Sequence, residues 1–268
     1  SISGVTSGGE DGQTVSIAIS DGTNTVNTTA TVDSNAYSVT GLDLSSLDDG
    51  TLSITADVND LAGNSATQAT DSTTKDTASP TISVAINDGG DGRLNASEDS
   101  SVTISGSTSG AEDGQTVSLN ISSSSGGTPI NTTASVSSNS YSVTGLDLSS
   151  LSDGTLTITA DVDDLAGNSA TQATDSTTKD TASPTIALTS DTSSLKAGET
   201  ATLTFTLSEA STNFTASDVS VSGGSLSGWS AGSSTSYSAT FTPTADSTTD
   251  AGISVASGAF SDSSGNTN

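Results

Sequence analysis

Residues 145–184 read GLDLSSLSDGTLTITADVDDLAGNSATQATDSTTKDTASP, and residues 41–80 repeat them with only three differences, at positions 48/152, 53/157 and 59/163. Inside this stretch, TLTITADV at 155–162 alternates apolar and polar residues, which is typical of a half-buried β-strand. LSDG before this run and LAGN after it are rich in turn-forming residues. The stretch therefore predicts short strands joined by tight turns, and its duplication predicts an array of similar modules.

The same pattern continues through the rest of the second copy. Its other alternating runs are TISVAI (81–86), SVTISG (101–106), QTVSLNI (115–121), NTTASV (131–136), YSVT (141–144) and SATQAT (169–174). Seven short strands within about 100 residues are the signature of an immunoglobulin-like (Ig-like) β-sandwich. We expect Tyr141 at the sandwich edge, with its hydroxyl hydrogen-bonded. The expected inward residues are Val102, Ile104, Val117, Leu119, Ile121, Val143, Leu156, Ile158 and Val162.

The predicted fold class is all-β, with tandem Ig-like seven-stranded sandwiches in an extended array. Module 1 is expected at 1–78, module 2 at 79–182 and module 3 at 183–268. Module 1 begins with SISGV, which aligns with the second strand of module 2, and module 3 ends in the loop before its last strand. Both are therefore expected to be incomplete, either because of where a boundary was drawn or because neighbouring chains donate the strands.

Composition and charge exclude several classes of protein. The 31 acidic residues outnumber 4 Lys plus Arg, for a net charge of −27; such a chain repels nucleic acid and attracts cations. Cysteine and histidine are absent, which excludes thiolate and imidazole sites and Ser-His-Asp catalysis, and no enzyme activity is expected. No run approaches the roughly 18 apolar residues of a membrane span, so direct membrane insertion is not expected.

Several motifs together resemble a known family. DTASPTI, NDGGDGRLNASED, ISGSTSGAEDGQTV, YSVT and ITADVDDLAGN occur in this order and resemble the bacterial Ig-like repeats of giant secreted adhesins, such as biofilm-associated proteins and the extender arms of RTX-type adhesins. Module 3, with FTASDVSVSGGSL and YSATFTPTAD, is similar to a sister type. The resemblance implies tandem β-sandwiches, Ca²⁺ at their junctions and an extracellular tether on the bacterial surface.

Oxygen-bearing side chains gather at the predicted exit of module 2. The loop 87–99 is acidic and rich in glycine, and Ca²⁺ prefers carboxylate and amide oxygens on such loops. In this topology the loop and Asp153 lie beside the predicted linker 175–184 and face module 3, including its Glu209. We therefore expect a Ca²⁺ site at this second junction. Its candidate ligands are Asp88, Asp91, Glu98, Asp180, Asp262 and Asn266.

A similar set is expected where module 1 meets module 2, beyond the predicted linker 71–80. Like charges at a junction would push the modules apart unless a cation bridges them. The alternative is that acidic turns only keep the surface soluble. The candidate ligands at this first junction are Asp76, Glu112, Asp113, Asp163, Asp164 and Asn168.

The expected function is a calcium-stiffened spacer in a large bacterial cell-surface adhesin or filament that mediates attachment and biofilm formation. Its expected partners are neighbouring repeats of the same polypeptide, with other copies of the chain as a further option. One alternative is a glycan-binding module that uses Trp229. Another is a self-assembling filament subunit completed by donated strands. Lys75 and Lys179 fall in the predicted linkers and are expected to be solvated charges rather than core residues.

Overall fold

A computed structural model describes residues 1–8 and 10–268. Apart from one short 3₁₀ turn, η1 (Ala216–Asp218), all its elements are β-strands, which confirms the predicted all-β class. Its contacts divide the chain into two compact units, Ser1–Pro80 with Asp163–Ala170, and Thr81–Val162 with Thr171–Asn268. The three-module boundaries stay a prediction. In the described residues no helix is long and apolar enough to cross a membrane.

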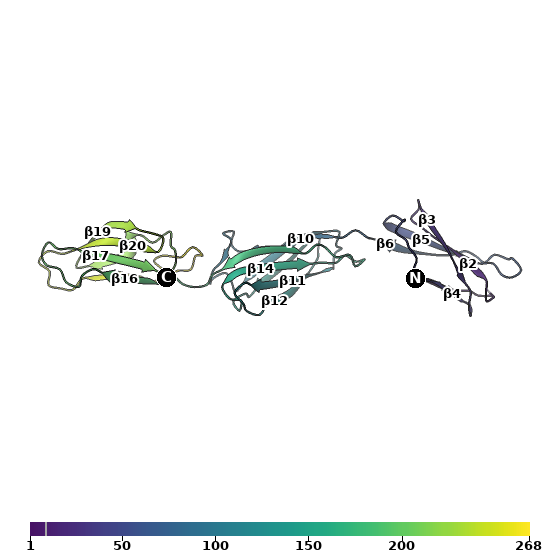
Figure 1. The fold of residues 1–268 in the computed structure, drawn as a ribbon, viewed down its shortest axis with the longest axis horizontal. Coiled ribbons are helices and arrows are strands. Elements are labelled where there is room, and N and C mark those ends of the chain that lie inside the picture. The colour runs from purple at the N-terminus through teal and green to yellow at the C-terminus, as the bar shows by residue number, and fades with distance from the viewer. Residues whose placement is uncertain (9) are drawn as a thin grey trace. The chain divides into compact units, whose positions relative to one another are not determined.

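Module 2 contains two sheets, drawn in blue and teal in Figure 1. The first consists of β13 (Ser140–Leu146), β10 (Val102–Ser109) and β7 (Thr81–Ile82), with β8 (Ala85–Asn87) also paired to β10. The second has the order β12 (Ile130–Ser135), β11 (Thr116–Ser123), β14 (Gly154–Asp161), β15 (Ala173–Lys179) and β9 (Arg93–Leu94). All pairs are antiparallel except β15 with β9.

The core of module 2 follows the predicted alternation. Every expected inward residue is buried except Val143, which is half-buried. Tyr141 is buried as predicted, and its hydroxyl donates to the carbonyl of Ser83, 2.6 Å away, in the connection between β7 and β8. A side chain at Gly106 would collide with that same carbonyl. Glycine on β10 therefore lets the first strand of the module lie close against the sheet.

The predicted position of the last strand of module 2 is wrong. We expected it at 169–174, but β15 begins at Ala173 and continues to Lys179, through half of the predicted linker. Ser169 forms only an isolated bridge with Asp163. The buried residues of β15 are polar, Thr177 and Lys179. A strand with polar inward residues has no hydrophobic alternation, so the pattern could not reveal it.

The prediction that Lys179 is a solvated linker charge is also wrong. Only 3% of its side chain is exposed, and its Nζ lies 3.2 Å from Asp99 and 3.4 Å from Asp153. It also donates to the carbonyl of Leu151 at 2.9 Å. A buried ammonium group needs such partners, because desolvation penalises an unpaired charge. Lys179 thus fastens the end of β15 to two loops of its own module.

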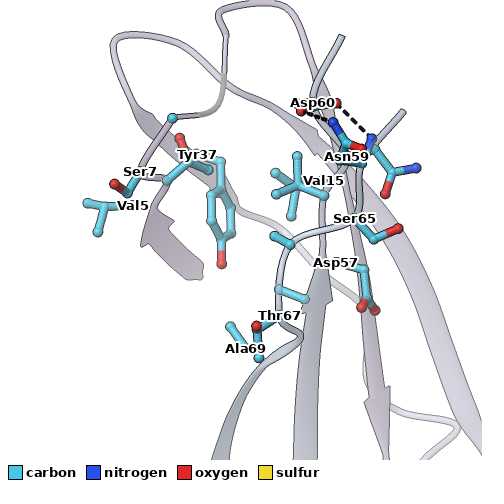
Figure 2. A pocket seen from close by; sticks show the side chains of 16 residues that line it. Val5, Ser7, Val15, Tyr37, Asp57, Asn59, Asp60, Ser65, Thr67 and Ala69 are labelled. Atoms are coloured by element: carbon cyan, nitrogen blue, oxygen red, sulfur yellow. Dashed lines mark hydrogen bonds between the residues drawn. The ribbon is translucent and has the colours of Figure 1, made fainter. Parts of the chain in front are cut away.

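In the described residues, both sheets of module 1 have fewer strands than those of module 2. The four-stranded sheet has the order β3 (Thr25–Thr31), β2 (Thr14–Ser20), β5 (Gly50–Asp57) and β6 (Ala69–Lys75), and the other sheet pairs β1 (Ile2–Val5) with β4 (Ala36–Val39). As in β15, residues Asp71 to Lys75 of β6 belong to a strand and not to a linker. Figure 2 shows Tyr37 projecting into a pocket between Val5 and Val15.

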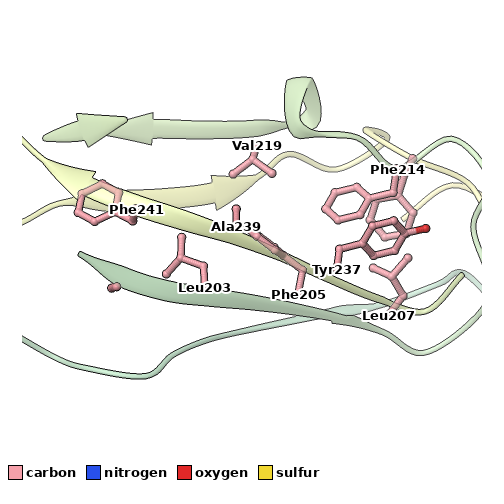
Figure 3. Close-up of a cluster of buried hydrophobic side chains, with 10 residues drawn as sticks. Leu203, Phe205, Leu207, Phe214, Val219, Tyr237, Ala239 and Phe241 are labelled. Carbon is pink, nitrogen blue, oxygen red and sulfur yellow. The ribbon is translucent and has the colours of Figure 1, made fainter. Parts of the chain in front are cut away.

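Module 3 has a different arrangement and a more aromatic core. Its larger sheet has the order β16 (Ile186–Ser190), β17 (Ala201–Leu207), β20 (Ser236–Pro243) and β19 (Gly224–Ala231), and its smaller sheet pairs β18 (Val219–Ser222) with β21 (Gly252–Val255). Figure 3 shows the buried cluster between them. Phe214 packs against Tyr237 with ring centroids 5.1 Å apart and against Phe260 at 5.0 Å. Large rings let a module with few apolar residues still fill a core.

Candidate metal centre at the second junction

Three carboxylates converge where module 2 passes into module 3, inside one compact unit. Asp180 directly follows β15, Glu209 lies after β17, and Asp262 lies in the loop after β21. One oxygen atom from each lies within 4.8 Å of the other two. In the described part of the chain this is the one group of three acidic side chains so close together. The end of one module and two loops of the next therefore supply a shared acidic site.

Asp262 is held in place by its own loop. One of its carboxylate oxygens accepts the backbone N–H groups of Ser264 (2.8 Å) and Asn266 (2.9 Å), and the other accepts the Asn266 side-chain amide (2.9 Å). That amide also donates to the backbone carbonyl of Asp180 at 2.9 Å. We call this Asp-x-x-x-Asn arrangement, bound to a preceding carbonyl, the Asp262–Asn266 clasp. It orients Asp262 toward the chain that leaves module 2.

The predicted acidic loop of module 2, residues 87–99, also contacts module 3 at this junction. The contacts are made by a backbone N–H group and an arginine, and not by the acidic side chains of the loop. The backbone N–H of Ala96 donates to the side-chain oxygen of Asn266 at 3.0 Å. The Arg93 guanidinium donates to the Ser264 hydroxyl at 3.3 Å, and that hydroxyl donates to Asp180 at 2.9 Å. These bonds fix the loop, the linker and module 3 to one another beside the carboxylates.

The electrostatics of the site favour a bound cation. Burial raises the pKa of Glu209 above its ordinary value, and the negative charges of Asp180 and Asp262 raise it further. The part of the pKa shift that comes from Asp180 and Asp262 reflects repulsion between like charges. The donor atoms are all oxygens, the set that hard cations such as Ca²⁺ and Mg²⁺ prefer. A divalent cation there would offset the repulsion.

The carboxylates of the predicted acidic loop accept hydrogen bonds from that loop and from β15. Asp88 accepts the Gly90 N–H (3.1 Å) and, through its second oxygen, the Thr177 hydroxyl (2.9 Å). Asp91 accepts the N–H of Arg93 (2.9 Å), and Glu98 accepts the N–H of Asn95 (3.0 Å). The structure therefore brings Asp180 and Asp262 together with Glu209, but not these three. Their role as ligands stays a prediction.

At the first junction Asp164 and Asn168 form an equivalent clasp, but the residues that the structure describes place no group of three close carboxylates beside it. Asp164 accepts the backbone and side-chain N–H groups of Asn168, both at 2.8 Å, and the Asn168 amide donates to the Asp76 carbonyl at 3.2 Å. The Asn168 side-chain bond is the main cause that lowers the pKa of Asp164. All three residues lie in the same compact unit.

The remaining candidates there have separate contacts. Asp113 accepts the Ser138 N–H at 2.7 Å, and Asp163 pairs with Ser169 through the backbone. Glu112 and Asp113 belong to the second compact unit, whereas Asp163 belongs to the first. A metal site formed by Asp76, Glu112 and the other candidates stays a prediction.

Two residues at the second junction, Glu209 and Ser264, were absent from the predicted ligand set. Glu209 was expected only to face the junction, and Ser264 was not expected there at all. The signal for Ser264 was available, because DSSGN at 262–266 aligns with DLAGN at 164–168. The serine replaces an alanine, and only the folded loop shows that its hydroxyl meets Asp180.

Trp229, the basis of the glycan-binding alternative, packs against the aromatic core of module 3. Its ring centroid lies 5.3 Å from that of Phe205, 5.4 Å from Phe214 and 5.8 Å from Tyr237. The side chain is half-buried. These contacts give Trp229 a packing role in the sandwich.

Comparisons with known proteins show what the chain is similar to. A tetra-tandem repeat in the extending region of a large adhesion protein is 28% identical, with a TM-score of 0.39, over 98% of this chain and 62% of that one. A Ca²⁺-stabilized adhesin that helps an Antarctic bacterium reach out and bind ice is 25% identical, with a TM-score of 0.39, over 89% and 59%. The chain thus spans less than two thirds of either.

A comparison with curated proteins gives no match. The family model described as "Bacterial Ig-like domain" matches residues 180–268. This range begins at Asp180, so it contains all three carboxylates of the acidic site as well as the strands of module 3. Residues 180–268 are therefore similar to a bacterial Ig-like domain.

Proposed function

We propose that this chain is a structural spacer of a large bacterial cell-surface or secreted adhesin or filament, and that Ca²⁺ stiffens its junctions. The observation that carries the proposal is the acidic site of Asp180, Glu209 and Asp262 at the junction of two modules. The near-identical repeats at 41–80 and 145–184 support it, because repeat arrays act through length and stacking.

The chemistry of the site explains how a cation would stiffen the junction. Asp180 belongs to the chain that leaves module 2, whereas Glu209 and Asp262 belong to module 3. A cation bound to all three would join the linker to two loops of the next module. Extracellular modules bind Ca²⁺ with dissociation constants of about 10⁻⁴–10⁻³ M. The junction would then be loose at cytosolic calcium concentrations and fixed outside the cell, where attachment and biofilm formation take place.

Isothermal titration of the full chain with CaCl₂ tests this proposal. Asp180→Asn should weaken Ca²⁺ binding at the second junction by at least about tenfold, since it removes one of three charged ligands. Asp33→Asn is the control and should leave binding unchanged, because Asp33 is an exposed acid that accepts the hydroxyl of its neighbour Ser34 and belongs to neither candidate ligand set. Equal binding by the wild type and Asp180→Asn would contradict a calcium site at this junction.

The finer parts of the proposal need their own test. Transfer of the repeats into a surface display host, followed by an attachment assay in millimolar Ca²⁺ and in chelator, measures whether the spacer supports adhesion. We expect attachment to fall in chelator for the wild type. It should fall already in Ca²⁺ for a chain with Asp180→Asn and Glu209→Gln. Attachment that is independent of Ca²⁺ would remove the stiffening role while leaving the spacer role intact.

A further inference from the structure

A buried lysine at the end of β15 lies against two carboxylates. The Nζ of Lys179 is 3.2 Å from a carboxylate oxygen of Asp99 and 3.4 Å from one of Asp153. The Asp99 side chain is 9% exposed, whereas that of Asp153 is 39% exposed. All three residues belong to the same compact unit. A primary amine is therefore held beside two carboxyl groups, and the nearer of them has little access to water.

The backbone fixes both members of the closer pair. Lys179 lies in register with Leu94 of the parallel strand β9. The backbone N–H of Asp99 donates to the Asn95 carbonyl at 3.1 Å, and the Asp99 carbonyl accepts the N–H of Leu148 at 2.7 Å. A rigid scaffold that holds two reacting groups in contact supplies much of what a reaction between them needs. The fold of module 2 thus keeps this amine and this carboxyl group together.

The residues next to the pair are apolar and buried. Leu94, Leu148 and Leu151, which all adjoin the pair, are at most 2% exposed. Desolvation penalises the charge on both groups. Transfer of the proton from the ammonium group to the carboxylate of Asp99 therefore costs less here than in water. The products of that transfer, a neutral amine and a neutral carboxylic acid, are the forms that react with each other.

Asp153 is placed to move protons at this site. It accepts the backbone N–H of Thr181 at 3.0 Å and the Thr181 hydroxyl at 3.1 Å, and such bonds favour an ionised carboxylate. A carboxylate beside the amine takes up a proton and returns it to a leaving group, as a general acid–base does. The Leu151 carbonyl, 2.9 Å from the Nζ of Lys179, is in place to accept the one N–H that an amide nitrogen would keep.

We propose that Lys179 and Asp99 condense after folding into an intramolecular amide bond, an isopeptide crosslink, with Asp153 as the general acid–base. Nζ forms a bond to the side-chain carboxyl carbon of Asp99, and the bond from that carbon to one of its oxygen atoms breaks. Asp153 takes a proton from the attacking amine and gives it to the departing hydroxyl group, which leaves as water. One ammonium and one carboxylate thus give one amide and one water, without an oxidant or a cofactor. The ion pair described above is the state before this reaction.

The repeat in module 1 provides an internal control. The Nζ of Lys75 lies 2.8 Å from Asp49 and 2.9 Å from the Leu47 carbonyl. These two correspond to the general acid–base and to the accepting carbonyl of module 2. In the described residues of this chain, Lys75 has no second carboxylate within ion-pair distance. We therefore expect Lys75 to keep its free amine.

Intact-mass spectrometry of the full chain, incubated in its folded state and then denatured, tests the proposal. The mass should be lower than that of the sequence by one water. Trypsin locates the bond, because it cuts after a free lysine but not after a crosslinked one. The unmodified chain gives peptides 94–179 and 180–196, whereas the crosslinked chain gives one peptide, 94–196, that lacks one water. Cleavage after Lys75 should be complete.

Two results of this digestion would overturn the proposal. One is a chain of full mass that is cut after Lys179. The other is a chain that has lost water but is still cut after Lys179, as a cyclic imide at one of its Asp-Gly pairs would produce.

Variants assign the role of each residue. Lys179→Arg keeps the positive charge but removes the amine, and it should keep its full mass. Asp99→Asn should lose ammonia instead of water, since its amide nitrogen is then the leaving group. Loss of water by Asp99→Asn would overturn the assignment, because the bond would then lead to Asp153. Asp153→Asn should slow the reaction at least about tenfold, whereas Asp49→Asn, its counterpart in module 1, should not; equal rates would remove Asp153 from the proposed reaction.

Discussion

Lys179 shows how strongly a single residue can depend on its surroundings in this chain. It has the same neighbours in sequence as Lys75, yet it is buried between Asp99 and Asp153. Although partial burial raises the pKa of Asp153, hydrogen bonds from Thr181 and the Lys179 charge outweigh it, and the pKa is lowered. Lys179 and its partners therefore form a buried network, whereas Lys75 and Asp49 form a more exposed pair.

Lys179→Met should lower the free energy of unfolding of module 2 by about 3–5 kcal/mol, because it leaves Asp99 buried without its counter-charge. Lys75→Met is the matched control and should cost clearly less, since water can solvate Asp49. Urea titration followed by resolved NMR signals of each module measures both. An equal loss of unfolding free energy in the two modules would show that the buried Lys179 network stabilises its module no more than the exposed Lys75–Asp49 pair does.

Glu209 predicts a pH dependence for the second junction. In chelator, the folded chain keeps Glu209 protonated to a higher pH than the unfolded chain, because burial and the charges of Asp180 and Asp262 raise its pKa. Stability therefore falls as the pH rises from the ordinary glutamate pKa through the raised one, and the loss persists above it. Glu209→Gln should remove this loss.

Thermal unfolding of module 3 at pH 4 and pH 7, with chelator and with CaCl₂, measures the effect. Glu199→Gln is the control, because Glu199 is an exposed glutamate of the same module that binds the N–H of Lys196. Calcium should restore the stability of the wild type at pH 7. A wild type that is more stable at pH 7 than Glu209→Gln, both in chelator, would contradict the repulsion.

At the scale of elements, most strands of module 2 lie near the apolar runs that predicted them, but two do not: β9 lies inside the segment 87–99 that was predicted to be a loop, and β15 begins later than predicted. TLTITADV alternates and appears as β14, and the other apolar runs appear within a few residues of their predicted places. β15 was displaced because its inward residues are polar and are satisfied only by distant partners: Asp175 by Ile86, Thr177 by Asp88 and Lys179 by Asp99. Pairs between residues so far apart in the sequence cannot be predicted from local patterns and are known only from the folded structure.

The two copies of this strand should differ in hydrogen exchange. In β15, the N–H of Thr178 donates to the Gly92 carbonyl at 3.2 Å, and the N–H of Asp180 donates to the Leu94 carbonyl at 3.0 Å. The corresponding amides of Thr74 and Asp76 lie on the edge of β6 that has no such partner strand in the described residues. Thr178 should exchange at least about tenfold more slowly than Thr74, because exchange reports local opening. Equal rates would mean that β9 does not protect β15.

At the scale of the whole molecule, the charge of −27 attracts cations to the chain. The sequence predicts that acids gather at the ends of modules, and in the structure Asp180 and Asp262 lie close to Glu209. It was not sufficient to predict which acids meet. Asp88, Asp91 and Glu98 have the right composition for a calcium loop, but their oxygens are used by nearby backbone and hydroxyl groups.

Measurements on the intact chain should distinguish general screening of the acidic charges by salt from Ca²⁺ binding at a specific site. NaCl should raise the unfolding temperature modestly by reducing repulsion among the acids. CaCl₂ at the same ionic strength should raise it further, because a bound ion stabilises only the folded chain. Calorimetry of the wild type and of Asp180→Asn with Glu209→Gln measures the difference. If both salts act equally on the wild type, screening alone explains the effect.

The parallel pairing of β9 with β15 has a mechanical consequence. β9 lies near the start of module 2 and β15 at its end, and both run in the same direction. When the two ends of the module are pulled apart, the strands are drawn past each other lengthwise. The hydrogen bonds from Thr178 and Asp180 then carry the force together instead of breaking one after the other. In a chain of such modules, the paired strands β9 and β15 would resist the pulling force near the end of each module, where it is linked to the next.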